Sequence, residues 1–103
     1  MSDPTLTDNT EEHRFEVAVD GTMAGFTEYR DEAGVRTFPH TEVKEEFGGR
    51  GLAKAVIQFG LDTSRRQGLQ VVPLCPAVAG FIRRNPDYLD LVPQERRAEF
   101  DLA

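Results

Sequence analysis

A glycine-rich turn is the most chemically suggestive part of this sequence. Gly48, Gly49 and Gly51 precede a helix-like segment and leave main-chain amides uncovered at its start. The first amides of a helix lack partners within the helix and lie at its positive end, so such a turn binds anions. Arg50 and Lys54 would add charge. The alternative is a tight turn that needs glycine only for its dihedral angles. Neither GxxxxGK[ST] nor GxGxxG occurs.

Cys75 is the only cysteine, so the chain forms no internal disulfide. It lies between Leu74 and Pro76, just before a predicted helix over residues 78–84. A helix N-terminus favours a reactive thiolate. The alternative is a small buried apolar side chain, because unpaired cysteines are often buried.

Four further polar side chains are candidates for a site. His40 and Glu42 fall on one face of a predicted strand, where either could act as a general base. The alternative is ordinary pairing on a partly solvated face. Arg83 and Arg84 end the 78–84 helix and could bind a phosphate or an acidic acceptor. Alternatively, the two arginines only stabilise the helix, because positive charges are favourable at a helix C-terminus.

The composition limits the classes of protein to consider. The 103 residues are 39% hydrophobic and 29% charged, which fits one small globular domain. No apolar run approaches the ~20 residues of a membrane helix, so we expect no membrane partner. The acidic start lacks the features of a secretory signal, and we expect a cytoplasmic protein.

The net charge of −6 is concentrated at the two ends of the chain. Residues 1–13 carry −4 and residues 87–103 carry −3, whereas residues 14–86 carry +1. No basic stripe interleaved with aromatic residues occurs, so nucleic-acid binding is disfavoured. We interpret 1–13 as a flexible acidic tail, 14–92 as the domain and 93–103 as a C-terminal tail or short helix.

Strands dominate the first half of the domain. Alternating apolar residues predict strands over 14–19, 23–29 and 35–43. Asp20-Gly21 signals a hairpin between the first two, and residues 31–34 form a second turn. Pro39 lacks an amide, so the third strand should contain a bulge or an unpaired stretch there.

Helices alternate with short strands in the second half. Apolar residues at helical spacing predict a helix from the glycine turn to about Gln67, followed by a C′ glycine at Gly68. A buried strand over 69–74, the 78–84 helix, a short strand over 88–92 and a weak helix over 94–100 follow. The fold class is therefore α+β: an antiparallel β-meander followed by a βαβ crossover and a short second helix.

The segment from Val43 to Ala53 resembles the acetyl-CoA-binding segment of the GNAT (Gcn5-related) N-acetyltransferases. That family has a strand, then a turn of the form Q/R-x-x-G-x-G/A that opens a helix. Gly49, Gly51 and Ala53 match, whereas Gly48 replaces the usual Gln or Arg. The resemblance extends over residues 14–92 and is strongest for a compact, single-domain subgroup, through Phe38-Pro39-His40-Thr41-Glu42-Val43 and the segments at 72–76 and 83–88.

The resemblance implies that the 35–43 strand and the 70–74 strand run parallel and then splay apart. Acetyl-CoA would place its pantetheine arm in that gap, against the backbone of Thr41 and Val43. Its pyrophosphate would rest on the turn, and a 3′-phosphate would reach Arg83 or Arg84. The cofactor-binding set implied is Thr41, Val43, Gly48, Gly49, Arg50, Gly51, Leu52, Ala53, Arg83 and Arg84.

The catalytic set implied is Cys75, His40 and Glu42. Cys75 would lie near the thioester, as an acyl acceptor or as a proton donor to the departing thiolate. Tyr88 could donate that proton instead, or it could be a core aromatic. Only Asp20-Gly21 joins the first two predicted strands, so the two helices that shape the acceptor site in larger members have no room.

The resemblance therefore implies an N-acetyltransferase that moves an acetyl group from acetyl-CoA to a primary amine. The acceptor would be a small molecule or a protein, no metal would take part, and we expect a monomer or a weak dimer. The alternatives are a non-catalytic acyl-CoA-binding or sensing module and a small partner-binding domain whose glycine turn is only structural.

Overall fold

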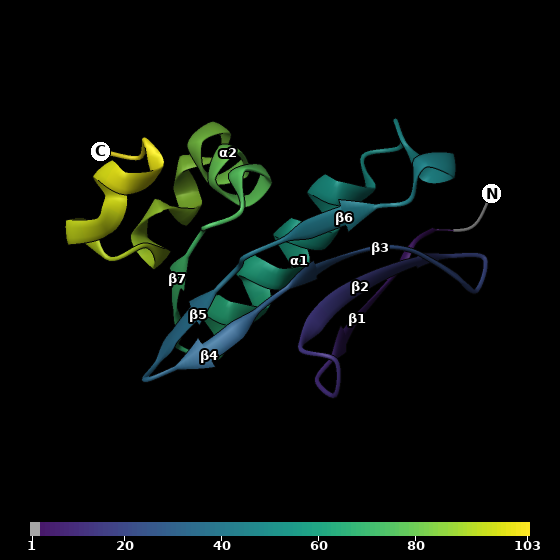
Figure 1. Ribbon diagram of the computed structural model, residues 1–103, viewed down its shortest axis with the longest axis horizontal. Coiled ribbons are helices and arrows are strands. Elements are labelled where there is room, and N and C mark those ends of the chain that lie inside the picture. The colour runs from purple at the N-terminus through teal and green to yellow at the C-terminus, as the bar shows by residue number, and fades with distance from the viewer. Residues whose placement is uncertain (1–2) are drawn as a thin grey trace.

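Two small sheets are covered by helices in the computed structural model, which describes residues 3–103 (Figure 1). The first sheet has the strand order β1 (Thr5–Asn9), β2 (Arg14–Val19), β3 (Thr22–Glu28), β6 (Thr41–Val43), all antiparallel. The second has the order β4 (Arg30–Glu32), β5 (Val35–Thr37), β7 (Gln70–Val72), with β5 and β7 parallel. This arrangement confirms the predicted α+β class.

Within residues 3–103, two α-helices and three 3₁₀-helices come after β6, and β7 lies between the two α-helices. The helices are η1 (Glu45–Phe47), α1 (Leu52–Arg66), α2 (Pro76–Arg84), η2 (Pro86–Leu91) and η3 (Gln94–Phe100). The α1 helix packs against the first sheet and also touches β7 and α2. Across residues 3–103, none of these helices has the length and apolar character needed to cross a membrane.

Both predicted hairpin turns are present. Asp20 and Gly21 have positive φ angles of 51° and 81°, and Ala33 and Gly34 have 52° and 80°. Two successive positive φ angles are typical of the tight turns that match the twist of hairpin strands. The turns join β2 to β3 and β4 to β5.

The prediction of a flexible tail over residues 1–13 is wrong for residues 5–9, which form β1 and pair with β2. Long-range contacts hold this strand. The Tyr29 hydroxyl donates to Asp8 over 2.7 Å, Asn9 donates to Glu16 over 2.9 Å, and Leu6 packs against the core. Tertiary partners thus impose a strand on a polar sequence of weak intrinsic preference. Of the predicted tail, residues 1–2 lie outside the described residues.

The strand predicted over 35–43 is divided between the two sheets. Residues 38–40 belong to neither β5 nor β6, so the strand is interrupted around Pro39, as expected. Arg36 and Phe38 are buried whereas His40 and Glu42 are exposed, so these alternate residues do not form one continuous face. The break at Pro39 ends the regular alternation of side chains.

The prediction of a last strand over 88–92 is also wrong, because residues 86–91 form the 3₁₀-helix η2. Pro86 fixes a helical φ at its start. Both oxygens of the Asp90 carboxylate accept hydrogen bonds from Arg65, at 2.8 and 3.0 Å, and the Tyr88 hydroxyl donates to Asp62 over 2.8 Å. These contacts dock η2 against α1 instead of adding it to a sheet.

The core lies between α1 and the concave side of the strands. It is formed mainly by buried residues of β2, α1, β7 and α2 and by Phe38, which follows β5; Phe15, Phe38 and Leu61 are among the largest. Gly60 allows α1 to approach closely, since a Cβ there would come within 2.9 Å of the Phe15 ring and 3.2 Å of the Phe38 ring. The core therefore fixes the position of α1, and with it the glycine turn at its start.

Candidate functional site

The parallel pairing of β5 with β7 ends in a hydrogen bond between Phe38 and Cys75. The Phe38 amide donates to the Val72 carbonyl over 2.9 Å, and the Cys75 amide donates to the Phe38 carbonyl over 2.8 Å. Beyond this point the two segments part, because residues 41–43 join β3 as β6 whereas Pro76 begins α2. We call the opening between β6 and residues 75–76 the splay, and it agrees with the expected divergence.

One edge of β6 faces the splay. The Glu28 amide donates to the His40 carbonyl and the Lys44 amide donates to the Ala24 carbonyl, each over 2.8 Å. Main-chain groups alternate in direction along an antiparallel strand, so residues 40, 42 and 44 turn theirs toward β3. Thr41 and Val43 consequently direct their main-chain groups to the opposite edge. This edge can pair with an extended ligand, as a neighbouring strand would.

The glycine turn lies directly before α1. Gly49 and Gly51 have φ angles of 78° and 74°, in the left-handed region that favours glycine. The Gly51 carbonyl accepts the first helical hydrogen bond, from the Ala55 amide, and no side chain caps the helix. The amides of residues 52–54 therefore lie at the positive end of α1 without helical partners. A Cβ on Gly49 or Gly51 would meet no atom within 4 Å, so the approach to the turn is open.

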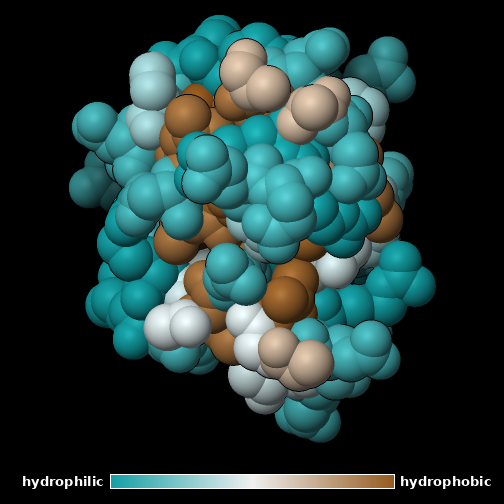
Figure 2. Space-filling view, turned by 90° about the vertical axis from the view of Figure 1, so that its left-hand side faces the viewer, coloured by the Kyte–Doolittle hydropathy of each residue, from teal (hydrophilic) through white to brown (hydrophobic). Residues whose placement is uncertain are grey.

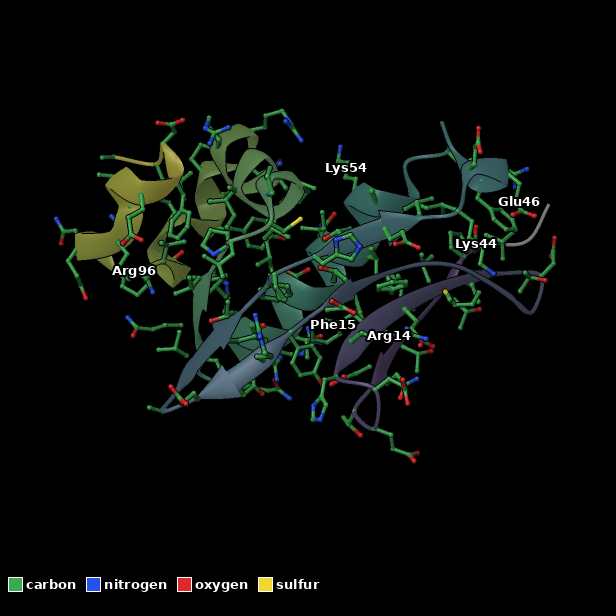
Figure 3. The ribbon with its side chains drawn as sticks, in the orientation of Figure 1. Arg14, Phe15, Lys44, Glu46, Lys54 and Arg96 are labelled. Atoms are coloured by element: carbon green, nitrogen blue, oxygen red, sulfur yellow. The ribbon has the colours of Figure 1, made fainter. Side chains whose placement is uncertain are left out.

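A groove of about 500 Å³ begins at this turn and runs between α1 and α2. Gly51, Ala53 and Lys54 line it from the start of α1, and Phe81, Arg84 and Asn85 are among the residues on the side of α2. Figure 3 shows Lys54 projecting from the first turn of α1, away from the sheet. Open main-chain amides and two cationic side chains thus face one groove, which suits a phosphorylated ligand.

The structure separates the two arginines that end α2. Arg84 lines the groove, and its role in binding phosphate stays a prediction. Arg83 instead donates to the carbonyls of Phe100 and Asp101, over 2.6 and 3.1 Å. Its guanidinium holds the C-terminal segment against α2, so the structure does not bring Arg83 to the groove. Figure 2 shows the end of the molecule that carries α2 and the C-terminal segment. There, apolar residues reach the surface only in narrow stretches between hydrophilic ones.

On the side of η1, the glycine turn is flanked by two acidic side chains, which would not favour an anion there. Arg50, in the turn, lies over the Phe47 ring, with 5.4 Å between the guanidinium carbon and the ring centre. Glu45 and Glu46 are exposed in η1, on the other side of the turn from the groove, and Figure 3 shows Glu46 near Lys44 at the end of β6. The cationic side chains that line the groove are therefore Lys54 and Arg84, whereas Arg50 lies over Phe47.

Cys75 occupies the apex of the splay. It is 6% exposed, and its carbonyl accepts hydrogen bonds from the Val78 and Ala79 amides as the N-cap of α2. The Cys75 thiol donates to the Thr41 hydroxyl over 3.5 Å. The thiol is therefore directed across the splay toward β6 and does not cap α2.

Glu42 lies on the outer face of β6 and contacts His40, which directly precedes the strand. The His40 Nε2 is 3.1 Å from a Glu42 carboxylate oxygen, and both side chains are more than half exposed. Successive side chains of a strand point to opposite faces, so Thr41, between them, turns toward Cys75. The structure thus brings Cys75 to Thr41, and it places Glu42, with His40 beside it, on the outer face of the same strand.

The Tyr88 side chain is directed away from the splay. The Tyr88 hydroxyl donates to Asp62, and burial together with this bond raises the pKa of Tyr88. The hydroxyl is therefore engaged away from the splay, and the ring packs on Phe81 with 5.6 Å between ring centres.

Thr27 was not predicted to belong to the site, yet its hydroxyl lies 2.8 Å from that of Thr41. Only the pairing of β3 with β6 reveals it, and no local sequence pattern encodes that pairing.

Within residues 3–103, no group of three or more His, Cys, Asp or Glu side chains is arranged to hold a metal ion. The candidate site is therefore built from main-chain amides, a free strand edge, one thiol and cationic side chains. It can accommodate an extended ligand with phosphates at one end and a reactive group near Cys75 at the other.

Comparisons with known proteins agree with this geometry. Residues 14–91 match the model of a family described as GCN5-related N-acetyl-transferase. The solution structure of a GCN5-like protein from Staphylococcus aureus superposes with a TM-score of 0.69 at 21% identity, covering 90% of this chain and 91% of that chain. The ribosomal-protein-alanine N-acetyltransferase from Brucella melitensis biovar Abortus 2308 gives a TM-score of 0.54 at 24% identity, covering 78% of this chain and 62% of that one. A search of curated protein sequences gives no match.

Proposed function

The chain belongs to the GCN5-related N-acetyltransferase family, and we propose that it binds acetyl-CoA and transfers the acetyl group to a primary amine. The observation that carries this proposal is the uncapped start of α1 beside the groove. Three open amides, Lys54 and Arg84 would together hold the phosphates of the nucleotide end. Arg83 has no part in this proposal.

The edge of β6 would hold the pantetheine arm. This arm carries amide groups, and the main-chain groups of Thr41 and Val43 are directed toward the splay, where they would pair with it. The groove and the splay both adjoin the first turn of α2, because Ala77 lines the groove and Cys75 caps the helix. One extended ligand could thus contact both.

When bound, acetyl-CoA supplies a thioester whose carbonyl carbon an amine can attack. The Thr41 amide, directed into the splay, would donate to the oxygen that gains negative charge. Cys75 would lie beside the thioester sulfur and give its thiol proton to the departing thiolate, or accept the acetyl group first. His40, just before β6, or Glu42, on its outer face, would first remove a proton from the incoming ammonium ion, directly or through water, so that the neutral amine can attack.

One observation favours a second function, a non-catalytic module that binds or senses acyl-CoA. The loops that join β1 to β2 and β2 to β3 are short, at residues 10–13 and 20–21. No helices in them cover the outer face of β6, so an acceptor would find only an open surface there. Binding without turnover would favour this alternative.

Calorimetry and thermal unfolding with acetyl-CoA, CoA and ATP test the proposal. Ligand at ~100 times its dissociation constant should stabilise the fold by about 2.7 kcal/mol. No change in Tm at millimolar acetyl-CoA would overturn acetyl-CoA binding. An equal effect of ATP would indicate a general phosphate site. Release of free CoA thiol in the presence of a panel of amines then separates the transferase from the sensing module.

A further inference from the structure

Three polar side chains form a hydrogen-bonded row across the inner end of the splay. The Cys75 sulfur is 3.5 Å from the Thr41 hydroxyl, which is 2.8 Å from the Thr27 hydroxyl. They come from three elements far apart in sequence: β3, β6 and the segment that follows β7. The row therefore exists only in the folded protein.

Strand pairing explains how the two threonines meet. Thr27 and Thr41 are direct partners in the β3–β6 register. The neighbouring pair, Glu28 with His40, is hydrogen-bonded through the main chain, so the Thr27–Thr41 pair belongs to the closely spaced, non-hydrogen-bonded type. The side chains of such pairs approach closely, which brings the two hydroxyls into contact.

This row of side chains is largely buried, and burying polar groups costs free energy that an apolar contact would not. Thr27 is fully buried and Cys75 is 6% exposed. A buried hydroxyl costs free energy unless it is hydrogen-bonded, whereas valine has the same shape, is favoured in strands and needs no partner. Two facing valines would fill the same space with no hydrogen-bonding requirement, whereas the two threonines pair with each other and also place a hydroxyl next to the thiol.

We propose that Thr41 and Thr27 are positioning residues that hold the Cys75 sulfur in the splay in both its protonated and its anionic forms. With a thiol, the S–H donates to Thr41. With a thiolate, the Thr41 hydroxyl turns to donate to sulfur and the Thr27 hydroxyl turns to donate to Thr41. Only hydroxyl hydrogens move, because either threonine oxygen can be the donor.

The proposal rests on the proposed acetyl transfer and defines a proton cycle for it. Cys75 gives its proton to the sulfur of the departing CoA thiolate, which leaves as the free thiol. The Cys75 thiolate, held by Thr41, then accepts the proton that the acetylated amine must lose. Cys75 thus gives one proton and regains one, so it returns to the thiol at the end of each cycle.

The rate of alkylation of Cys75 by iodoacetamide between pH 6 and pH 10 tests the row in the intact chain. Thr41→Val keeps the side-chain shape and removes the hydroxyl. We expect alkylation about three- to tenfold slower at pH 7 and a rate profile displaced to higher pH, with the same plateau at high pH. The plateau reports access to the sulfur, and the position of the profile reports stabilisation of the thiolate.

Three further variants make the result decisive. Thr41→Ser should restore the wild-type profile, and Thr27→Val should displace it in the same direction by less. Thr63→Val is the matched control, because this buried threonine of α1 accepts a hydrogen bond from Arg66 and should leave the profile unchanged. An unchanged profile in Thr41→Val, or a change in the plateau alone, would overturn the proposal.

The double variant Thr27→Val with Thr41→Val separates positioning from packing. It leaves no unpaired buried hydroxyl, so it should be more stable than Thr41→Val alone while keeping the displaced profile. Recovery of the wild-type profile in the double variant would contradict the proposal. These measurements need no acetyl-CoA, so failure of acetyl-CoA binding would overturn the proposed function without deciding the role of the threonines.

Discussion

Arg83 and Arg84 are adjacent at the end of α2, yet their side chains serve different parts of the molecule. Arg84 lines the groove at the start of α1, whereas Arg83 donates to the carbonyls of Phe100 and Asp101. The pair therefore provides an internal control: the two residues share type, helix and exposure, and only one faces the groove.

Replacement of Arg84 by alanine should weaken acetyl-CoA binding by about three- to tenfold, since an exposed charge–phosphate contact is partly screened by solvent. Replacement of Arg83 by alanine should leave affinity unchanged and lower the free energy of unfolding by about 1 kcal/mol, through loss of its hold on η3. Calorimetric titration and urea unfolding of both variants measure the two effects. Equal affinities for the two variants would remove Arg84 from the binding site.

Gly51→Val should abolish acetyl-CoA binding. A β-branched side chain would stand where a phosphate must approach the amides, and φ at 74° is unfavourable for valine. Gly34→Val is the matched control for this strain, because Gly34 has φ of 80°, lies in an open hairpin and is remote from the groove. We expect both variants to lose roughly 1–2 kcal/mol of stability and only Gly51→Val to lose binding. Binding by Gly51→Val at the wild-type level would show that the amides do not hold the ligand.

The sequence predicts best where a local signal decides the structure. Asp20-Gly21 encodes its turn within two residues, and the apolar spacing of residues 52–66 encodes α1 within one helix. The strand at 5–9 has a single apolar residue, Leu6, and depends on distant partners such as Glu16 of β2 and Tyr29, which lies between β3 and β4. No local pattern could predict it.

The same distinction applies to the site. The open amides follow from the glycines of the turn and were predicted, and Cys75 was expected near the end of the 70–74 strand. The sequence could not distinguish Arg83 from Arg84, because the direction of each depends on the packing of η3. It also could not reveal Thr27, whose contact with Thr41 depends on a strand register set by the whole sheet.

The alkaline stability of the fold should depend on Tyr29. Burial and the hydrogen bond to Asp8 raise the pKa of Tyr29 to about 12. The folded state therefore holds this proton more tightly than the unfolded state, where the pKa is about 10. The resulting stabilisation is complete below pH 10 and is lost as the pH rises through 12.

Urea unfolding of the wild type and of Tyr29→Phe between pH 7 and pH 12 measures this dependence. The variant should be less stable by about 1 kcal/mol at pH 7, because β1 loses the bond from Tyr29 to Asp8. Its free energy of unfolding should also fall less steeply above pH 10. Parallel curves for the two proteins would show that Tyr29 does not carry the alkaline transition.

Cys75 should contribute to the transfer step more than to binding. Its sulfur is directed across the splay to Thr41, and its main-chain amide is already occupied by Phe38, so its side chain is the part free to act on a ligand. Cys75→Ala should lower kcat for acetyl transfer by about 100-fold, as expected for loss of a general acid, with little change in the Kd for acetyl-CoA. An interaction made only in the transition state has this signature.

Bound CoA should also slow alkylation of Cys75, because the pantetheine arm would fill the splay in front of the sulfur. Full turnover by Cys75→Ala, with alkylation unaffected by CoA, would make Cys75 a core residue, and direct attack by an amine activated by His40 or water would then be the mechanism that the geometry allows.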